Sequence, residues 1–175
     1  MFDPESLTPR SFGAPDDYRW KPRHFVLSEF FRSRTANKKQ IYNLPLNTER
    51  RDVFNNLERL ALESLDPIRQ ELGRPVFITS GYRSPELNKA VGGVATSNHI
   101  LGCAVDFVVP GVSALNVVNT VKDMLARGLK GFLFHRLINE YDEWLHIEHT
   151  GAPTNSIWKE TRTSLKFDNE PRKFI

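Results

Sequence analysis

The chain has 175 residues, 39% of them hydrophobic and 26% charged, which is typical of a globular domain with a real core. Its formal net charge of +3 suits an acidic polymer as partner, but no basic stripe with interleaved aromatic residues indicates nucleic acid binding. A single cysteine excludes an internal disulfide framework, and no apolar run reaches the ~18 residues of a membrane span.

One globular domain is expected, with an irregular segment at each end. Residues 1–24 contain several prolines among polar residues and predict an extended N-terminal arm. The domain itself is expected over residues 25–150, and the polar stretch 151–175 is expected to be a C-terminal extension. The first residues lack the basic start and apolar run of a secretory signal, so we expect synthesis in the cytoplasm without a signal peptide.

A short apolar segment follows the arm. Ser28 has the side chain of a helix cap and predicts a small helix that starts at Glu29. Residues 38–46, which include a proline, are predicted to form a loop.

The clearest helix is predicted after this loop, with Asn47 or Thr48 as its cap. Its apolar residues recur every three or four positions as far as Leu72, which is the spacing of one helix face. Gly73 should end it. Pro67 lies inside the pattern and is expected to kink or divide the helix, because proline lacks the backbone N–H.

The second half of the domain predicts strands that alternate with short helices. Residues 76–79 are predicted to be a short buried strand, and Ser84 is predicted to cap a short helix that begins with Pro85. Two glycines at 92–93 should end that helix, and residues 103–108 are predicted to form the next strand.

A further helix and a hairpin complete the predicted fold. Ser113 is expected to cap a helix that Gly128 stops, and residues 132–138 and 144–149 predict a β-hairpin. The expected fold class is therefore α+β, with helices packed on one side of a mainly antiparallel sheet.

A histidine and an aspartate, His99 and Asp106, stand seven residues apart around Gly102. Asp106 falls in a predicted buried strand, where a carboxylate is costly unless a cation or another partner compensates it. His146 follows in the last predicted strand, and two histidines with one aspartate are a typical protein ligand set for catalytic zinc. The alternative is a structural pair between a loop histidine and a strand aspartate.

The remaining histidines and the cysteine are interpreted as structural. His24, His135 and His149 have no comparable context and are expected to be surface or core residues. Cys103 is expected to face away from Asp106, as a small core residue and neither a ligand nor a nucleophile.

Four motifs occur in order: Ser80-Gly81-Tyr82-Arg83-Ser84-Pro85-Glu86-Leu87-Asn88, Gly92-Gly93, Ser97-x-His99-x-x-Gly102-x-Ala104-x-Asp106 and Trp144-x-His146. Together they resemble the zinc D-alanyl-D-alanine carboxypeptidase family, which includes D-Ala-D-Ala dipeptidases and phage L-alanyl-D-glutamate endolysins. The resemblance runs from about residue 25 to about residue 149, and the stretch at its start, Phe25-Val26-Leu27-Ser28-Glu29-Phe30, resembles the carboxypeptidase-like branch. It implies a small α+β fold, shared with the signalling domain of Hedgehog proteins, with the metal on an antiparallel sheet.

The resemblance also implies roles for individual residues. The zinc ligands would be His99, Asp106 and His146, and Arg83 would bind substrate. A guanidinium group beside the site can hold a carboxylate or an oxyanion, although a hydrogen bond that stabilises the turn is the alternative for Arg83. Ser97 is expected either to position substrate or to have a structural role.

Two glutamates are candidates for the general base that a metallopeptidase needs. Glu143 lies three residues before His146, a spacing that resembles the dipeptidase branch, and Glu140 lies six before, as in Hedgehog-like and many carboxypeptidase-like members. If residues 141–143 form a three-residue turn, Glu140 pairs with Trp144 and shares a face with His146. A bulge would be needed to bring Glu143 to that face.

The sequence therefore predicts a Zn²⁺-dependent peptidase that hydrolyses peptidoglycan stem peptides, of the D-Ala-D-Ala carboxypeptidase or the L-Ala-D-Glu endopeptidase type. We expect a phage lysin that acts on the cell wall after release, or a virion component. We expect a monomer whose partner is the peptidoglycan peptide, with no nucleic acid or membrane partner. The alternative is a non-catalytic zinc-binding domain that binds cell wall or forms part of a virion.

Overall fold

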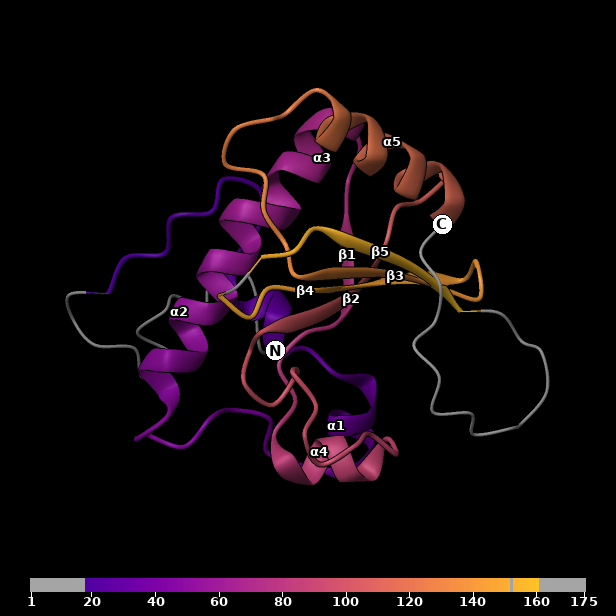
Figure 1. Ribbon diagram of the computed structural model, residues 1–175. Helices are drawn as coiled ribbons and strands as arrows, with labels where there is room; N and C mark the ends of the chain where they lie inside the picture. Colours follow the sequence, from indigo (N-terminus) through magenta and orange to yellow (C-terminus); the bar gives the residue numbers. More distant parts are fainter. Residues whose placement is uncertain (1–17, 152, 161–175) are drawn as a thin grey trace.

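The computed structural model describes residues 18–151 and 153–160, which form a five-stranded sheet with helices packed against it (Figure 1). The strand order is β1-β2-β4-β3-β5, and every neighbouring pair is antiparallel except β3 and β5, which are parallel. The strands are β1 (Phe77–Ser80), β2 (Ala104–Val108), β3 (Arg136–Glu140), β4 (Trp144–Glu148) and β5 (Ser156–Glu160). This mixed architecture with a mainly antiparallel sheet confirms the predicted α+β class.

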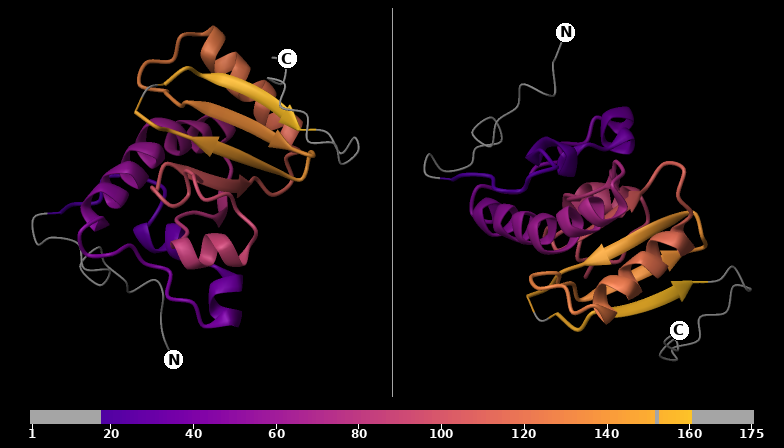
Figure 2. Two further views of the ribbon diagram at one scale, coloured as in Figure 1. Left: turned by 60° about the horizontal axis from the view of Figure 1, so that its bottom comes forward. Right: turned by 90° about the horizontal axis from the view of Figure 1, so that it is seen from above.

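Helices lie above and below the sheet in the view of Figure 1, and the sheet face that does not line the core is here called the open face. They are η3 (Leu27–Phe31), α1 (Arg34–Lys39), α2 (Arg50–Leu60), η4 (Ala61–Leu65), α3 (Asp66–Leu72), α4 (Pro85–Ala90) and α5 (Ala114–Ala126). In the left view of Figure 2, α3 and α5 both lie behind the sheet. The side chains that the strands send to this face are buried in the core: Val105, Phe107, Leu137, Leu145, Ile147 and Ile157.

The long predicted helix is present as three consecutive segments, α2, η4 and α3. Pro67 lies in the first turn of α3, directly after the π-helical turn η4, so the expected division of the helix is confirmed. Because proline has no N–H to donate to Glu63, the Glu63 carbonyl is free to accept a hydrogen bond from the Leu133 N–H at 2.9 Å. The predicted cap was wrong, since the helix begins at Arg50 with Glu49 in the cap position.

The first short helices differ from the prediction. Ser28 lies inside η3 and does not cap it; the Glu29 carboxylate instead accepts a hydrogen bond from the Val26 N–H at 3.0 Å. The predicted loop 38–46 begins two residues too early, because α1 continues to Lys39. Ser33 caps α1, whose composition is too polar to show an apolar periodicity in the sequence.

Strand β1 is at the edge of the sheet. The prediction of a buried strand was wrong for Phe77, which is 54% exposed, although Val76 immediately before it is buried. Since β1 pairs only with β2, one of its edges and much of one face remain accessible. The predicted caps Ser84 and Ser113 are confirmed, because each accepts a backbone N–H from the first turn of its helix.

The two terminal segments contribute to the domain where the structure describes them. The Tyr18 hydroxyl donates to the Phe54 carbonyl at 3.1 Å, and the Trp20 indole donates to the Phe25 carbonyl at 2.7 Å. Strand β5 falls within the expected C-terminal extension, yet it pairs with β3 and belongs to the sheet. The rest of the expected arm and extension, residues 1–17, 152 and 161–175, lies outside the described residues.

No helix between residues 18 and 160, as far as these residues are described, is long and apolar enough to cross a membrane.

Gly102 lies where the loop before β2 meets α2. Its φ is +70°, and a Cβ at this position would stand 2.8 Å from the Val53 carbonyl oxygen. Glycine is therefore needed both for its backbone conformation and for the close approach of the two segments. Gly128 has a similar φ of +63° but has nothing within 4 Å of such a Cβ.

The two glycines give a matched test. We expect Gly128→Ala to lower the free energy of unfolding by about 1–2 kcal/mol, which is the cost of a left-handed alanine. Gly102→Ala should cost about 1–3 kcal/mol more, because the methyl group also overpacks the contact with α2. Urea unfolding of both variants measures the difference, and equal losses would contradict the close approach.

Candidate metal centre

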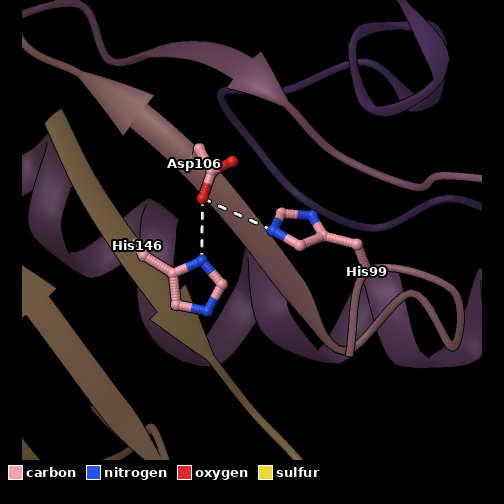
Figure 3. Close-up of side chains that lie close together, drawn as sticks. All are labelled: His99, Asp106 and His146. Carbon is pink, nitrogen blue, oxygen red and sulfur yellow. Dashed lines mark hydrogen bonds and ion pairs between the residues drawn. The ribbon is translucent and has the colours of Figure 1, made fainter. Parts of the chain in front are cut away.

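Three side chains meet on the open face of the sheet: His99 from the loop before β2, Asp106 from β2 and His146 from β4 (Figure 3). One nitrogen or carboxylate oxygen from each lies within 4.8 Å of the others. Asp106 Oδ1 is 2.7 Å from His146 Nδ1 and 3.4 Å from His99 Nε2. The structure thus brings together the three residues that the sequence proposed as metal ligands.

Strand alternation explains two of these positions. Val105 and Phe107 point into the core, so Asp106 between them points to the opposite face. In the same way Leu145 is buried, and the next residue, His146, lies on the open face. Asp106 and His146 are direct partners in the register of β2 and β4, which makes their side chains neighbours.

Backbone hydrogen bonds shape the loop that carries His99. The Arg83 N–H donates to the His99 carbonyl at 3.2 Å, and the Cys103 N–H donates to the Asn98 carbonyl at 2.9 Å. These bonds tie the loop to the segment after β1 and to the start of β2. His99 is consequently held over the end of β2 with its side chain buried.

Each histidine ring is fixed by the nitrogen that faces away from Asp106. His99 Nδ1 lies 2.7 Å from the Gly81 carbonyl oxygen, so Nδ1 carries the proton and donates it. His146 Nε2 lies 2.9 Å from Glu148 Oε1 and can donate there. Histidines that bind metals almost always donate their second N–H in this way, to a carbonyl or a carboxylate.

The Asp106 carboxylate has a separate partner for each oxygen. Oδ1 faces the two histidines, and Oδ2 accepts a hydrogen bond from Arg83 Nη2 at 2.6 Å. Burial alone would raise the pKa of Asp106, but its hydrogen bonds with His146 and His99 outweigh burial and hold the pKa well below its usual range. Asp106 is therefore ionised, as a metal ligand must be.

His146 lies between two carboxylates. Burial would lower its pKa, but hydrogen bonds to Asp106 and Glu148 raise the pKa to about 9. The pKa of Glu148 falls to about 2, because its bonds with His146 and Arg136 outweigh the opposing effect of burial. A pKa of about 9 favours the imidazolium form of His146 at neutral pH when no metal is bound, and both of its ring nitrogens then face carboxylates.

The donor set fits zinc. Two imidazole nitrogens and one carboxylate oxygen are ligands that zinc commonly takes, and three protein ligands leave one position for water or substrate. His99 is buried, whereas the side chains of Asp106 and His146 are 12% and 14% exposed. Asp106 and His146 thus keep a small part of their side chains accessible to solvent.

Arg83 lies beside this cluster, as the resemblance implied. Its Nη2 donates to Asp106, and its Nε donates to Ser80 Oγ at 2.8 Å. Ser97 is in the turn before His99, where its backbone N–H donates to the Val94 carbonyl at 3.1 Å. It is not one of the three clustered residues.

The two candidate bases lie at the tight turn of the hairpin: Glu140 ends β3, and Glu143 is the last residue of the turn. Glu140 pairs with Trp144 across three intervening residues, which confirms the predicted turn and places Glu140 on the face of His146. Glu143 is exposed, and its N–H donates to the Glu140 carbonyl at 2.9 Å. Neither glutamate belongs to the cluster formed by His99, Asp106 and His146.

Sequence reasoning missed Glu148 and Arg136 as parts of the site. Glu148 shares a face with His146 two residues earlier, and that alternation was the only signal for it. The link to Arg136 depends on the register of β3 and β4, which no local pattern shows.

The residues expected to be structural do not join the cluster. His149 is buried and pairs with Glu63 at 2.6 Å, His135 bonds to Thr150, and His24 is exposed. Cys103 is buried as predicted, and burial raises the pKa of its thiol.

Comparison with known proteins adds a family to this geometry. The model of the family described as Peptidase M15 matches residues 23–148, well over half of the chain, and the match includes all three clustered residues. No curated protein matches the chain.

The ionisation of His146 gives a test of the centre. At pH 7.5, zinc binding should release about one proton from His146, because the metal replaces the proton on Nδ1. As the pH rises towards about 9, less of this proton remains to be displaced, so the apparent affinity should increase and then level off. Calorimetric titrations in buffers of different ionisation enthalpy measure the release; the same heat in every buffer would contradict it.

Proposed function

Since the chain belongs to the peptidase M15 family of metal-dependent peptidases, we propose that it is a zinc-dependent hydrolase of peptidoglycan stem peptides. The observation that carries this proposal is the His99–Asp106–His146 cluster on the open face of the sheet. Each histidine already has a fixed acceptor for its other ring N–H, which is the arrangement found in histidines that bind metals.

The proposed ligand atoms are those that face one another in the cluster: His99 Nε2, Asp106 Oδ1 and His146 Nδ1. When bound there, zinc would polarise the peptide carbonyl and lower the pKa of a water molecule. The protein contributes the fixed positions of these atoms, since two come from neighbouring strands and the third from a loop tied to them.

Arg83 has two proposed roles in the reaction. Its bond to Asp106 Oδ2 leaves Oδ1 as the oxygen that faces the histidines, and this steadies the ligand. Its Nη1 is not needed for the bonds to Asp106 and Ser80 and can bind a substrate carboxylate or the developing oxyanion. Ser97 is proposed to shape the loop that bears His99.

Glu140 and Glu143 remain the two candidates for the base that takes a proton from the attacking water and returns it to the leaving amine. The register favours Glu140, because it shares the face of His146. The spacing of Glu143 before His146 favours Glu143 by resemblance to the dipeptidase branch.

The finer identity of the substrate is also a proposal. Stem peptides contain D-amino acids, and the bond would be the terminal D-Ala-D-Ala or the L-Ala-D-Glu bond. The proposed setting is a phage lysin or virion component that acts on the cell wall as a monomer. The proposed domain covers residues 25–150 together with β5.

Two buried histidines provide a matched test of the metal site. His99→Gln should abolish stoichiometric zinc binding and the release of peptides or D-alanine from purified peptidoglycan. His149→Gln should keep both properties, because His149 pairs with Glu63 outside the cluster. Mass spectrometry of the digest, with and without a chelator, identifies the bond that is cut. Zinc binding without any product from wild-type protein would favour the alternative, a non-catalytic binding domain.

Substitution of the two glutamates identifies the base. Glu140→Gln or Glu143→Gln should lower kcat by roughly 10²–10⁴-fold, while the variant of the other glutamate keeps most of its activity. Zinc content should stay at the wild-type value in both, since neither residue belongs to the cluster. If both variants cleave at the wild-type rate, the base lies elsewhere.

A further inference from the structure

We propose that Glu148 and Arg136 are positioning residues of the metal centre: Arg136 holds Glu148, and Glu148 holds the His146 ring with Nδ1 towards Asp106. This inference rests on the proposed function, because it concerns the same metal site. It assigns a role to two side chains that make no contact with the reacting atoms.

Glu148 is built into the sheet next to His146. The two residues are alternate members of β4 and lie on one face of it. Glu148 Oε1 is 2.9 Å from His146 Nε2, and the Glu148 side chain is only 6% exposed. A buried carboxylate has little freedom to move away, so this hydrogen bond is a lasting constraint on the ring.

Arg136 holds Glu148 through both oxygens. Arg136 is the register partner of Glu148 across β3 and β4, so the two side chains start from adjacent positions on one face. Nε donates to Oε2 at 3.1 Å and Nη2 donates to Oε1 at 2.9 Å. This two-point contact fixes the plane of the carboxylate, which a single lysine ammonium group cannot do.

The hydrogen bonds from Arg136 to Glu148 and from His146 to Glu148 decide which ring nitrogen of His146 is free to bind a metal. With Nε2–H donated to Glu148, the lone pair of the neutral ring is on Nδ1, the atom 2.7 Å from Asp106 Oδ1. His99 has the opposite arrangement, since its Nδ1–H is held by the Gly81 carbonyl. A backbone acceptor cannot be lost by substitution, so His146 is the ligand whose orientation depends on side chains.

The structure also contains a control pair of the same chemistry. His149 Nε2 lies 2.6 Å from Glu63 Oε2, and His149 is buried, but neither residue belongs to the cluster. Loss of that pair removes a buried histidine–glutamate bond without touching a proposed ligand. It therefore separates a general effect on stability from an effect on the metal.

The experiment measures metal binding directly. Competition with a chelating dye gives the zinc affinity, and the visible spectrum of the Co²⁺ form reports the ligand geometry. Glu148→Gln should weaken zinc binding by roughly 10–100-fold and change the Co²⁺ spectrum, because the neutral amide is a poorer acceptor. Arg136→Lys should weaken zinc binding and change the Co²⁺ spectrum to a smaller extent. Glu63→Gln should leave the zinc affinity and the Co²⁺ spectrum unchanged.

The outcomes distinguish this inference from the proposed function. If the wild-type protein binds neither ion, the metal site itself is wrong. If it binds them and folded Glu148→Gln keeps the wild-type affinity and spectrum, the positioning role is overturned. Arg136→Gln carries the test if Glu148→Gln does not fold, because Arg136 is more exposed; wild-type affinity and spectrum in that variant also overturn the proposal.

Discussion

The arrangement of the open face depends on the buried carboxylate of Asp106. A negative charge in the middle of a sheet costs several kcal/mol unless charged or hydrogen-bonding partners surround it. Here Arg83 takes one oxygen and the two histidines face the other. These partners come from segments on both sides of β2, so satisfying one carboxylate brings the segment after β1, the loop of His99 and β4 to a common point.

The long helix is joined to the same hairpin through Glu63. Its carbonyl accepts the Leu133 N–H before β3, and its side chain bonds to His149 after β4. The neighbouring Ser64 hydroxyl donates to the Leu133 carbonyl at 2.6 Å. The π turn that accompanies Pro67 thus leaves a backbone carbonyl for the segment before β3, and this bond joins the long helix to the hairpin.

The parts of the site that could be predicted are those with a local cause. Alternation along β2 and β4 placed Asp106 and His146 on one face, and the turn length placed Glu140 with them. Contacts that depend on non-local register could not be seen in this way: Arg136 reaches Glu148 only because β3 and β4 pair as they do. Strand β5 was missed because its polar residues do not predict a strand by themselves, and its parallel pairing with β3 is a non-local contact.

The hairpin turn shows why the base could not be decided from spacing. Tyr141 and Asp142 both have left-handed φ values, of 57° and 60°, which cost roughly 1–3 kcal/mol each for residues other than glycine. Asn139 compensates part of this cost, since its side chain donates to the Asp142 carboxylate at 2.6 Å and accepts the Asp142 N–H at 3.0 Å. A turn held in a costly conformation sets the directions of the residues on either side, and these residues are Glu140 and Glu143. The backbone of this turn and the register of β3 and β4 therefore set the direction in which each glutamate side chain starts, which its distance from His146 in the sequence does not give.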